Sequence, residues 1–209
     1  MKTYTGERSF PWWKVLLFAA VTGVYTGAVM LFPALKDSSF QDIGISYECW
    51  IVFAVWVVTG CRRPLEAACK CFVFFLISQP LVYLTEVVFG SLSVEMACHY
   101  YFRIWLPMTM LTLPGGFIAW YCKKQTVFGG IVLGIANGME LLLGIVYALC
   151  VYRDFPHHLL TALFCFASVP AMTLLLQRTK KSRTAAFLTP LVLAAAALLF
   201  LKLTGRVLI

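Results

Sequence analysis

The feature that most constrains this fold is a succession of apolar stretches, each near the length that crosses a bilayer, separated by short polar segments. A helix needs about 20 mainly apolar residues to cross the hydrocarbon core. Inside lipid every backbone polar group needs an internal partner, so helices are expected rather than open strands. Measured in this way, the chain contains seven predicted spans: Trp12–Phe32, Ile43–Gly60, Lys70–Gly90, Arg103–Cys122, Val127–Val151, Leu159–Gln177 and Ala185–Leu203.

The composition supports a membrane location. Of 209 residues, 61% are hydrophobic and 12% are charged, whereas a soluble domain has about 25% charged residues. A core cannot absorb this excess, because a chain of this length still exposes much of its surface. We therefore predict an all-α fold, a single polytopic transmembrane helix bundle over residues 1–209, with no room for a separate soluble domain.

Basic residues predict the orientation. Twelve of the 17 precede the first span or lie in the second-to-third, fourth-to-fifth and sixth-to-seventh connections or at their edges, and five lie on the opposite side. Basic connections stay in the cytoplasm, so we expect a cytoplasmic N-terminus and an outside C-terminus in a multi-pass protein of the cell membrane. This placement also accounts for the net charge of +8 without a nucleic-acid partner.

Glu140 is the sharpest candidate for function. It is the fourteenth residue of the 25-residue fifth span, and therefore near the bilayer centre. Ionisable groups there cost about 2.5–3.5 kcal/mol and usually face the bundle interior or a water-filled cavity. On a helical wheel Asn137, Glu140, Gly144 and Tyr147 share one face. The competing interpretation is a protonated Glu140 that joins two helices by hydrogen bonds to Asn or Gln.

A ridge of glycines runs beside this polar face. Gly130, Gly134 and Gly138 recur every four residues. Such small residues let the backbone of a neighbouring helix approach closely. We therefore predict that a helix, of this chain or of a partner, packs on this ridge.

A second polar strip lies on the third span, where Gln79, Tyr83 and Glu86 recur at helical spacing. Glu86 is near the outer interface, where Arg103 at the start of the fourth span could pair with it. We take these residues, together with Glu140 and Asn137, as the candidate substrate-binding set.

Prolines near the middle of spans predict helix breaks. Pro80 follows Gln79, Pro114 and Gly115 lie in the fourth span, and Pro170 lies in the sixth. Broken helices with polar side chains at the midplane form the binding sites of many transporters. The alternative is a set of kinked helices that merely pack.

The two prolines of the third and seventh spans also hint at an internal repeat. Gln79-Pro80-Leu81-Val82 resembles Thr189-Pro190-Leu191-Val192, and two triplets of spans could be joined by an inverting fourth helix. The prolines, however, fall at different depths in their predicted spans, which argues against a repeat.

The sequence offers little for metal, cofactor or enzyme chemistry. The eight cysteines lie in apolar segments or at their ends, Cys69 and Cys71 lack metal-ligand spacing, and His157 and His158 form no ligand pair at helical spacing. There is no HExxH, GxSxG, P-loop or dinucleotide motif. We therefore expect no metal and no cofactor, and any energy coupling would come from an ion gradient or a separate subunit.

Three functions remain open. The first is binding or translocation of a small neutral or cationic solute, by a carrier or by the membrane subunit of a transporter. An anion is disfavoured because amides and a carboxylate occupy the midplane without a central Arg or Lys. The second is an accessory protein that docks a partner on the glycine ridge. The third is an enzyme acting on a lipid-like substrate with Glu86, His99, Arg103 and His157.

Overall fold

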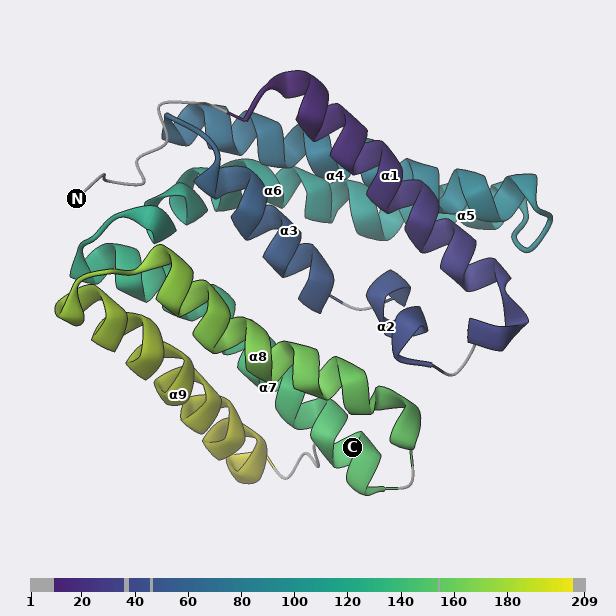
Figure 1. The fold of residues 1–209 in the computed structure, drawn as a ribbon. Coiled ribbons are helices and arrows are strands. Elements are labelled where there is room, and N and C mark those ends of the chain that lie inside the picture. The colour runs from purple at the N-terminus through teal and green to yellow at the C-terminus, as the bar shows by residue number, and fades with distance from the viewer. Residues whose placement is uncertain (1–9, 36–37, 46, 154, 205–209) are drawn as a thin grey trace. The chain divides into compact units, whose positions relative to one another are not determined.

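The fold is that of a computed structural model, which describes residues 10–35, 38–45, 47–153 and 155–204 (Figure 1). Helices make up its regular structure, and no β-strand occurs in these four ranges. The prediction of an all-α fold is confirmed for this part of the chain.

Among the residues that the structure describes, five helices are long and apolar enough to cross a membrane. Each coincides with a predicted span, although two begin earlier than hydropathy indicates, because basic residues are compatible with the first turns of a helix. Proline begins one of these two, a position where its missing N–H costs nothing, and the Thr179 hydroxyl caps the other. The five are α1 (Trp12–Leu31), α4 (Pro64–Val88), α7 (Val127–Tyr152), α8 (Leu159–Leu176) and α9 (Lys180–Leu203).

The second predicted span is divided. Helix α2 (Ser39–Ile45) ends before α3 (Glu48–Thr59) begins. The 12 residues of α3 extend about 18 Å at 1.5 Å per residue, which is short of the ~30 Å hydrocarbon core. The single helix expected over residues 43–60 is therefore wrong in its boundaries.

The fourth predicted span is helical but differs in extent. Helix α5 (Val94–Tyr100) begins before Arg103 and continues through a π-helical turn, η2 (Tyr101–Trp105), into α6 (Leu106–Ala119). Arg103 thus lies in the π turn and not at a helix start. The remaining short elements are single 3-10 turns: η1 (Pro33–Leu35), η3 (Trp120–Lys123) and η4 (Pro156–His158).

The chain divides into two compact units. Unit 1 comprises residues 1–46 and 53–120, and unit 2 comprises residues 47–52 and 121–209. A single bundle of all the spans stays a prediction.

In unit 1, α4 packs against both α1 and α6 (Figure 1). Phe18 of α1 stacks on Phe74 of α4 with ring centroids 5.1 Å apart. It also contacts Phe53 of α3 edge-on at 5.2 Å. At the other face of α4, the Trp120 Nε1 donates a hydrogen bond of 3.0 Å to the carbonyl of Cys61, which ties the end of α6 to the start of α4.

A buried lysine secures the beginning of α1. Lys70 of α4 is 1% exposed, and its ammonium group donates to the carbonyl of Phe10 and to the carboxylate of Glu66, each at 2.5 Å. The same group lies 5.3 Å from the ring centre of Trp12. Lys70, which hydropathy places at the start of the third predicted span, therefore lies inside α4. Its three interactions offset the free-energy cost of burying the charge.

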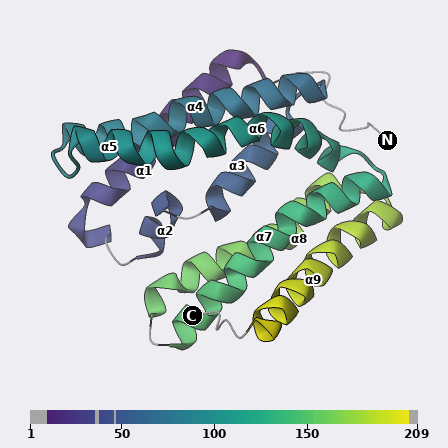
Figure 2. The ribbon, with the colours of Figure 1, turned by 180° about the vertical axis from the view of Figure 1, so that it is seen from behind.

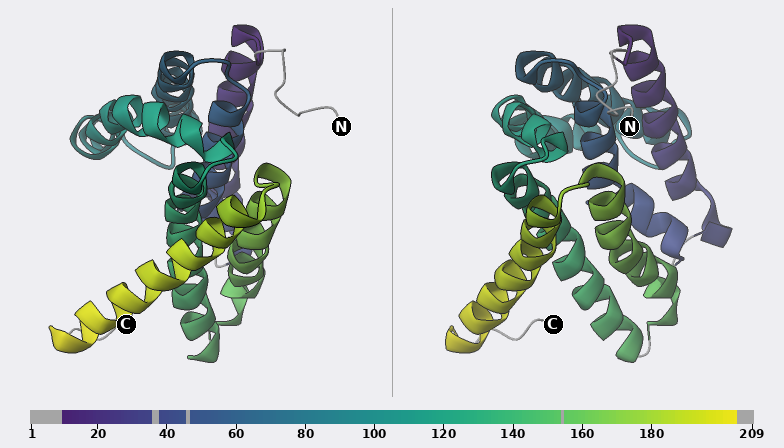
Figure 3. Two further views of the ribbon diagram at one scale, coloured as in Figure 1. Left: turned by 90° about the vertical axis from the view of Figure 1, so that its left-hand side faces the viewer. Right: turned by 60° about the vertical axis from the view of Figure 1, so that its left-hand side comes forward.

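In unit 2, α7 packs against both α8 and α9 (Figures 2 and 3). Gln125, just before α7, donates to the carbonyl of Leu176 at 2.7 Å and accepts from the backbone N–H of Arg178 at 2.6 Å. Gln177 donates in turn to the carbonyl of Cys122. These bonds hold the segment before α7 against the turn between α8 and α9, so both lie at one end of the unit.

Candidate functional site

The polar face predicted for the fifth span is buried and faces α8. Asn137 and Glu140 are both 0% exposed. One turn further along α7, a Cβ on Gly144 would lie 3.0 Å from the Cβ of Cys165 in α8, so the two helices are in close contact there. Glycine at position 144 therefore brings α8 near enough for its side chains to reach the polar groups of α7.

The nitrogen of the Asn137 side-chain amide has hydrogen-bond partners, whereas its oxygen has none. Its amide nitrogen donates to the hydroxyl of Thr173 at 2.8 Å, with a longer contact of 3.5 Å to the carbonyl of Ala186. Its Oδ1 is buried and has no hydrogen-bond donor. A buried acceptor without a donor costs about 1–3 kcal/mol, so this oxygen is suited to a ligand that brings an N–H, an O–H or a positive charge.

The two carboxyl oxygens of Glu140 likewise differ in their hydrogen bonding. The Ser168 hydroxyl donates toward Glu140 Oε2 at 3.2 Å and toward the carbonyl of Cys165 at 2.8 Å. A serine hydroxyl has a single hydrogen, so it serves one acceptor at a time. Glu140 Oε1 is buried without any partner. The Cys165 thiol also interacts with the carboxyl group, and a proton or a cation would supply the partner that Oε1 lacks.

A second carboxyl group lies nearby. Glu48 begins α3, belongs to unit 2 and is 0% exposed. It is near enough to interact electrostatically with Glu140. Glu48 falls within the second predicted span, Ile43–Gly60, and was not among the predicted site residues. Two buried carboxyl groups close together strengthen the preference of this site for positive charge.

The other predicted substrate-binding residues lie in unit 1. Gln79 is 2% exposed and its Nε2 has no acceptor, while Tyr83 stacks on Tyr100 with ring centroids 6.3 Å apart. Glu86 is half-buried and Arg103 is exposed, and no ion pair joins them in the ranges that the structure covers. The structure thus brings together Asn137 and Glu140, and whether the unit 1 residues line the same site stays a prediction.

Unit 1 has buried hydroxyl groups that sequence reasoning missed. Thr26 of α1, Ser78 of α4 and Thr109 of α6 are at most 2% exposed, and the side-chain oxygen of each has no partner. The available signal was the small-residue pattern of α1, where Thr22, Gly23, Thr26 and Gly27 form a ridge like that of α7.

The prolines do not end their helices. Helices α4, α6 and α8 continue through Pro80, Pro114 and Pro170, and Gly115 lies within α6. Each proline still removes one backbone donor, so the carbonyl one turn earlier loses its helical partner. The expectation of broken helices at these positions is therefore corrected to continuous helices with local gaps in hydrogen bonding.

The helix on the glycine ridge is α9 of the same chain. A Cβ on Gly130 would collide with the carbonyl of Ser182, and one on Gly134 would lie 2.5 Å from the Cβ of Thr189. At Gly138 it would lie 2.8 Å from Leu193. Contacts that advance together along both helices show that α7 and α9 run parallel.

Neither a metal-binding cluster nor a relative of known function assigns a role to this chain. Within the described ranges, no group of three or more His, Cys, Asp or Glu residues could hold a metal ion. No protein-family model, curated protein or solved structure matches this chain. The buried polar groups of α7 and α8 are therefore the main indication of function.

Proposed function

We propose that this protein is a seven-span membrane protein that binds and translocates a small cationic or neutral solute, as a carrier or as the membrane subunit of a transporter. The supporting observation is the excess of acceptors at Asn137 and Glu140, where two fully buried oxygens lack donors. An amine, an alkali cation or a solute rich in N–H groups would supply what these oxygens lack.

The directions of the helices support the seven-span topology. In unit 1, α1 and α4 run parallel, since Gly23 meets Ser78 and Gly27 meets Val82. The chain must therefore cross back between them, and α2 and α3 are the segments that can do so. In unit 2 the directions of the successive helices α7, α8 and α9 alternate in the same way. The basic connections then give a cytoplasmic N-terminus, an outside C-terminus and a place in the cell membrane.

The accessory-protein alternative is weaker because the glycine ridge is already covered. A partner helix on Gly130, Gly134 and Gly138 would have to displace α9. A partner subunit would accordingly bind elsewhere on the protein.

The proposal is tested first by binding. Purified protein in detergent is heated in NaCl, KCl or methylammonium chloride, with N-methylglucamine chloride at equal ionic strength as reference. A cation at about 100 times its dissociation constant stabilises the folded state by ~2.7 kcal/mol. We expect the rise in melting temperature to vanish in Glu140→Gln and to persist in Glu95→Gln, which removes an exposed carboxylate of α5.

Uptake is the second measurement. Proteoliposomes are assayed for entry of radiolabelled sodium and methylammonium, and the cation that stabilises the protein should enter faster than in protein-free vesicles. Uptake and stabilisation that survive Glu140→Gln would show that Glu140 only joins α7 to α8.

A further inference from the structure

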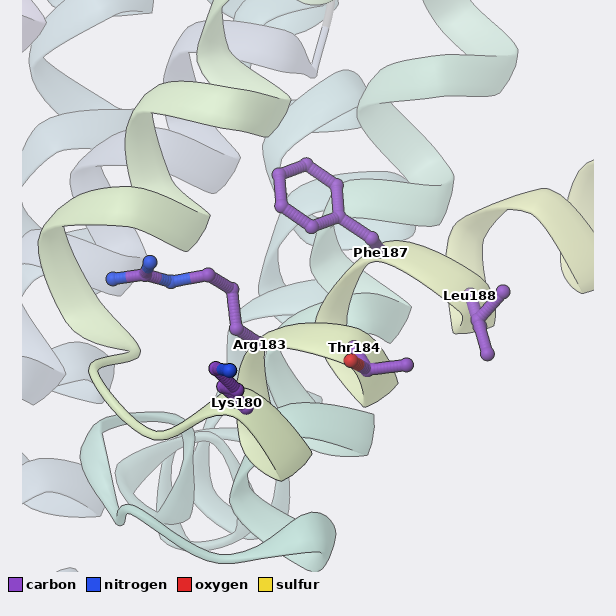
Figure 4. Close-up of a pocket in the computed structure, with 5 residues that line it drawn as sticks. All are labelled: Lys180, Arg183, Thr184, Phe187 and Leu188. Atoms are coloured by element: carbon purple, nitrogen blue, oxygen red, sulfur yellow. The ribbon is translucent and has the colours of Figure 1, made fainter.

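A pocket lies at the start of α9, away from the polar pairs of α7 and α8. It measures about 360 Å³ and is lined by Lys180, Arg183, Thr184, Phe187 and Leu188 (Figure 4). The two cations come from the first turn of the helix, and the two apolar side chains follow about one to two turns later. The pocket is therefore basic at the helix end and apolar toward the middle of the span.

The arginine of this pocket is held in position. Arg183 donates through Nε and one Nη to the carbonyl of Gln177, at 3.1 and 3.0 Å. This fixes the guanidinium group beside the turn between α8 and α9. Lys180 is exposed. One cation is thus preorganised and the other can adjust to a bound group, an arrangement suited to a phosphate.

In the described part of unit 2, no acidic side chain lies at the surface beside Lys180, Lys181 and Arg183. The acidic side chains in the described part of unit 2 are Glu48 and Glu140, both fully buried. Through two hydrogen bonds, Gln125 joins the basic segment before α7 to the basic turn between α8 and α9. The six basic residues at this end are Lys123, Lys124, Arg178, Lys180, Lys181 and Arg183.

We propose that this pocket binds an anionic phospholipid, with its phosphate on Lys180 and Arg183 and an acyl chain along Phe187 and Leu188. Clusters of basic residues at the end of a membrane helix attract anionic lipids, and basic pockets there bind their headgroups. The sequence of charge, hydroxyl and apolar side chains along α9 matches the order of headgroup, glycerol and chain in a phospholipid. The proposal is independent of solute transport.

The experiment is a lipid titration of delipidated full-length protein followed by native mass spectrometry. Phosphatidylglycerol and phosphatidylcholine with identical acyl chains are compared. We expect tighter binding of phosphatidylglycerol, and a dissociation constant about fivefold higher in Lys180→Gln, the size of one basic contact. The matched control is Lys181→Gln, which removes the same charge from the adjacent exposed residue outside the pocket.

A second variant tests the pocket without changing charge. Thr184→Trp fills the space between the cations and the apolar side chains, so it should weaken phosphatidylglycerol binding while the melting temperature stays unchanged. An equal loss in Lys180→Gln and Lys181→Gln, with no effect of Thr184→Trp, would overturn the proposal in favour of diffuse attraction.

The last arm separates a lipid from a soluble anion. Glycerophosphoglycerol carries the same headgroup without acyl chains, and inorganic phosphate carries the charge alone. We expect neither to compete with phosphatidylglycerol at concentrations tenfold above that of the lipid. Full displacement by either would identify a soluble-anion site and would overturn the lipid assignment.

Discussion

The two units contain parallel helix pairs that are built alike and differ in polarity. In unit 1, Gly23 of α1 approaches the carbonyl of Ser78 in α4, where a Cβ would lie 2.5 Å away. In unit 2, Gly134 of α7 approaches Thr189 of α9, where the corresponding distance is also 2.5 Å. In both pairs the second helix carries its proline close to this contact.

The spacing along the chain is the same in both pairs. Gly134 follows Gly23 by 111 residues, Gly138 follows Gly27 by 111, and Pro190 follows Pro80 by 110. This agreement favours an internal repeat of three helices, which the apparent depths of the prolines argued against. The prolines nevertheless lie at different distances from the starts of their helices, since α4 begins at Pro64 and α9 at Lys180.

The difference lies in what each pair carries beside the glycines. At the same spacing, Asn137 corresponds to Thr26 and Glu140 to Val29. Thr26 and Val29 are as deeply buried as their counterparts, at 1% and 5% exposure. A shared packing scaffold thus carries a threonine and a valine in unit 1 where unit 2 carries an asparagine and a carboxyl group, so the proposed cation site belongs to unit 2.

The largest expected effect comes from giving unit 1 the missing carboxyl group. Val29→Glu places an ionisable group inside an apolar helix, at a cost of about 2.5–3.5 kcal/mol. We expect a large fall in melting temperature and in yield, whereas Val29→Met, similar in length and uncharged, should retain both. If Val29→Glu folds normally, Glu140 needs no special partners in α8, and the contrast between the units disappears.

Replacing a glycine at the helix contact should destabilise both parallel pairs to a similar extent. A Cβ on Gly23 or Gly130 meets a backbone carbonyl that cannot turn aside, so alanine at either position should destabilise its unit by about 1–3 kcal/mol. Gly115→Ala is the control, because nothing lies within 4 Å of its Cβ. Maleimide labelling on heating reports each unit separately, through buried Cys71 in unit 1 and buried Cys165 in unit 2. Early labelling of the same cysteine by both variants would contradict two separate packing pairs.

The smallest expected effect distinguishes a hydroxyl group that accepts a hydrogen bond from one that has no partner. Thr173→Val removes the acceptor of Asn137 and should cost about 1 kcal/mol, at the lower end because the carbonyl of Ala186 remains within 3.5 Å. Thr26→Val removes an oxygen without a partner and should leave stability unchanged or raise it. Thermal melts of the two purified variants decide between these outcomes. A loss at Thr26 equal to that at Thr173 would indicate that Thr26 has a partner of its own.

Helix positions and the polar face of α7 could be predicted from the sequence, because span length and the 3.6-residue period act locally. Asn137 and Glu140 were found in this way. The partners of these residues could not be predicted, since Thr173 and Ser168 lie in another helix and only the packing allowed by Gly144 selects them. The burial of Glu48 and Lys70 could not be predicted from local sequence patterns either, because both residues are buried by segments that are distant along the chain.

The parallel pairs have a consequence for biosynthesis. Ser78 follows Gly23 by 55 residues, and Thr189 follows Gly134 by 55. At about 5–20 residues per second, the ribosome needs ~3–10 s to produce the second helix after the first. During that interval the glycine faces of α1 and α7 have no final partner, and the helix made in between must not occupy them. Each parallel pair is therefore completed only after its second helix has been made.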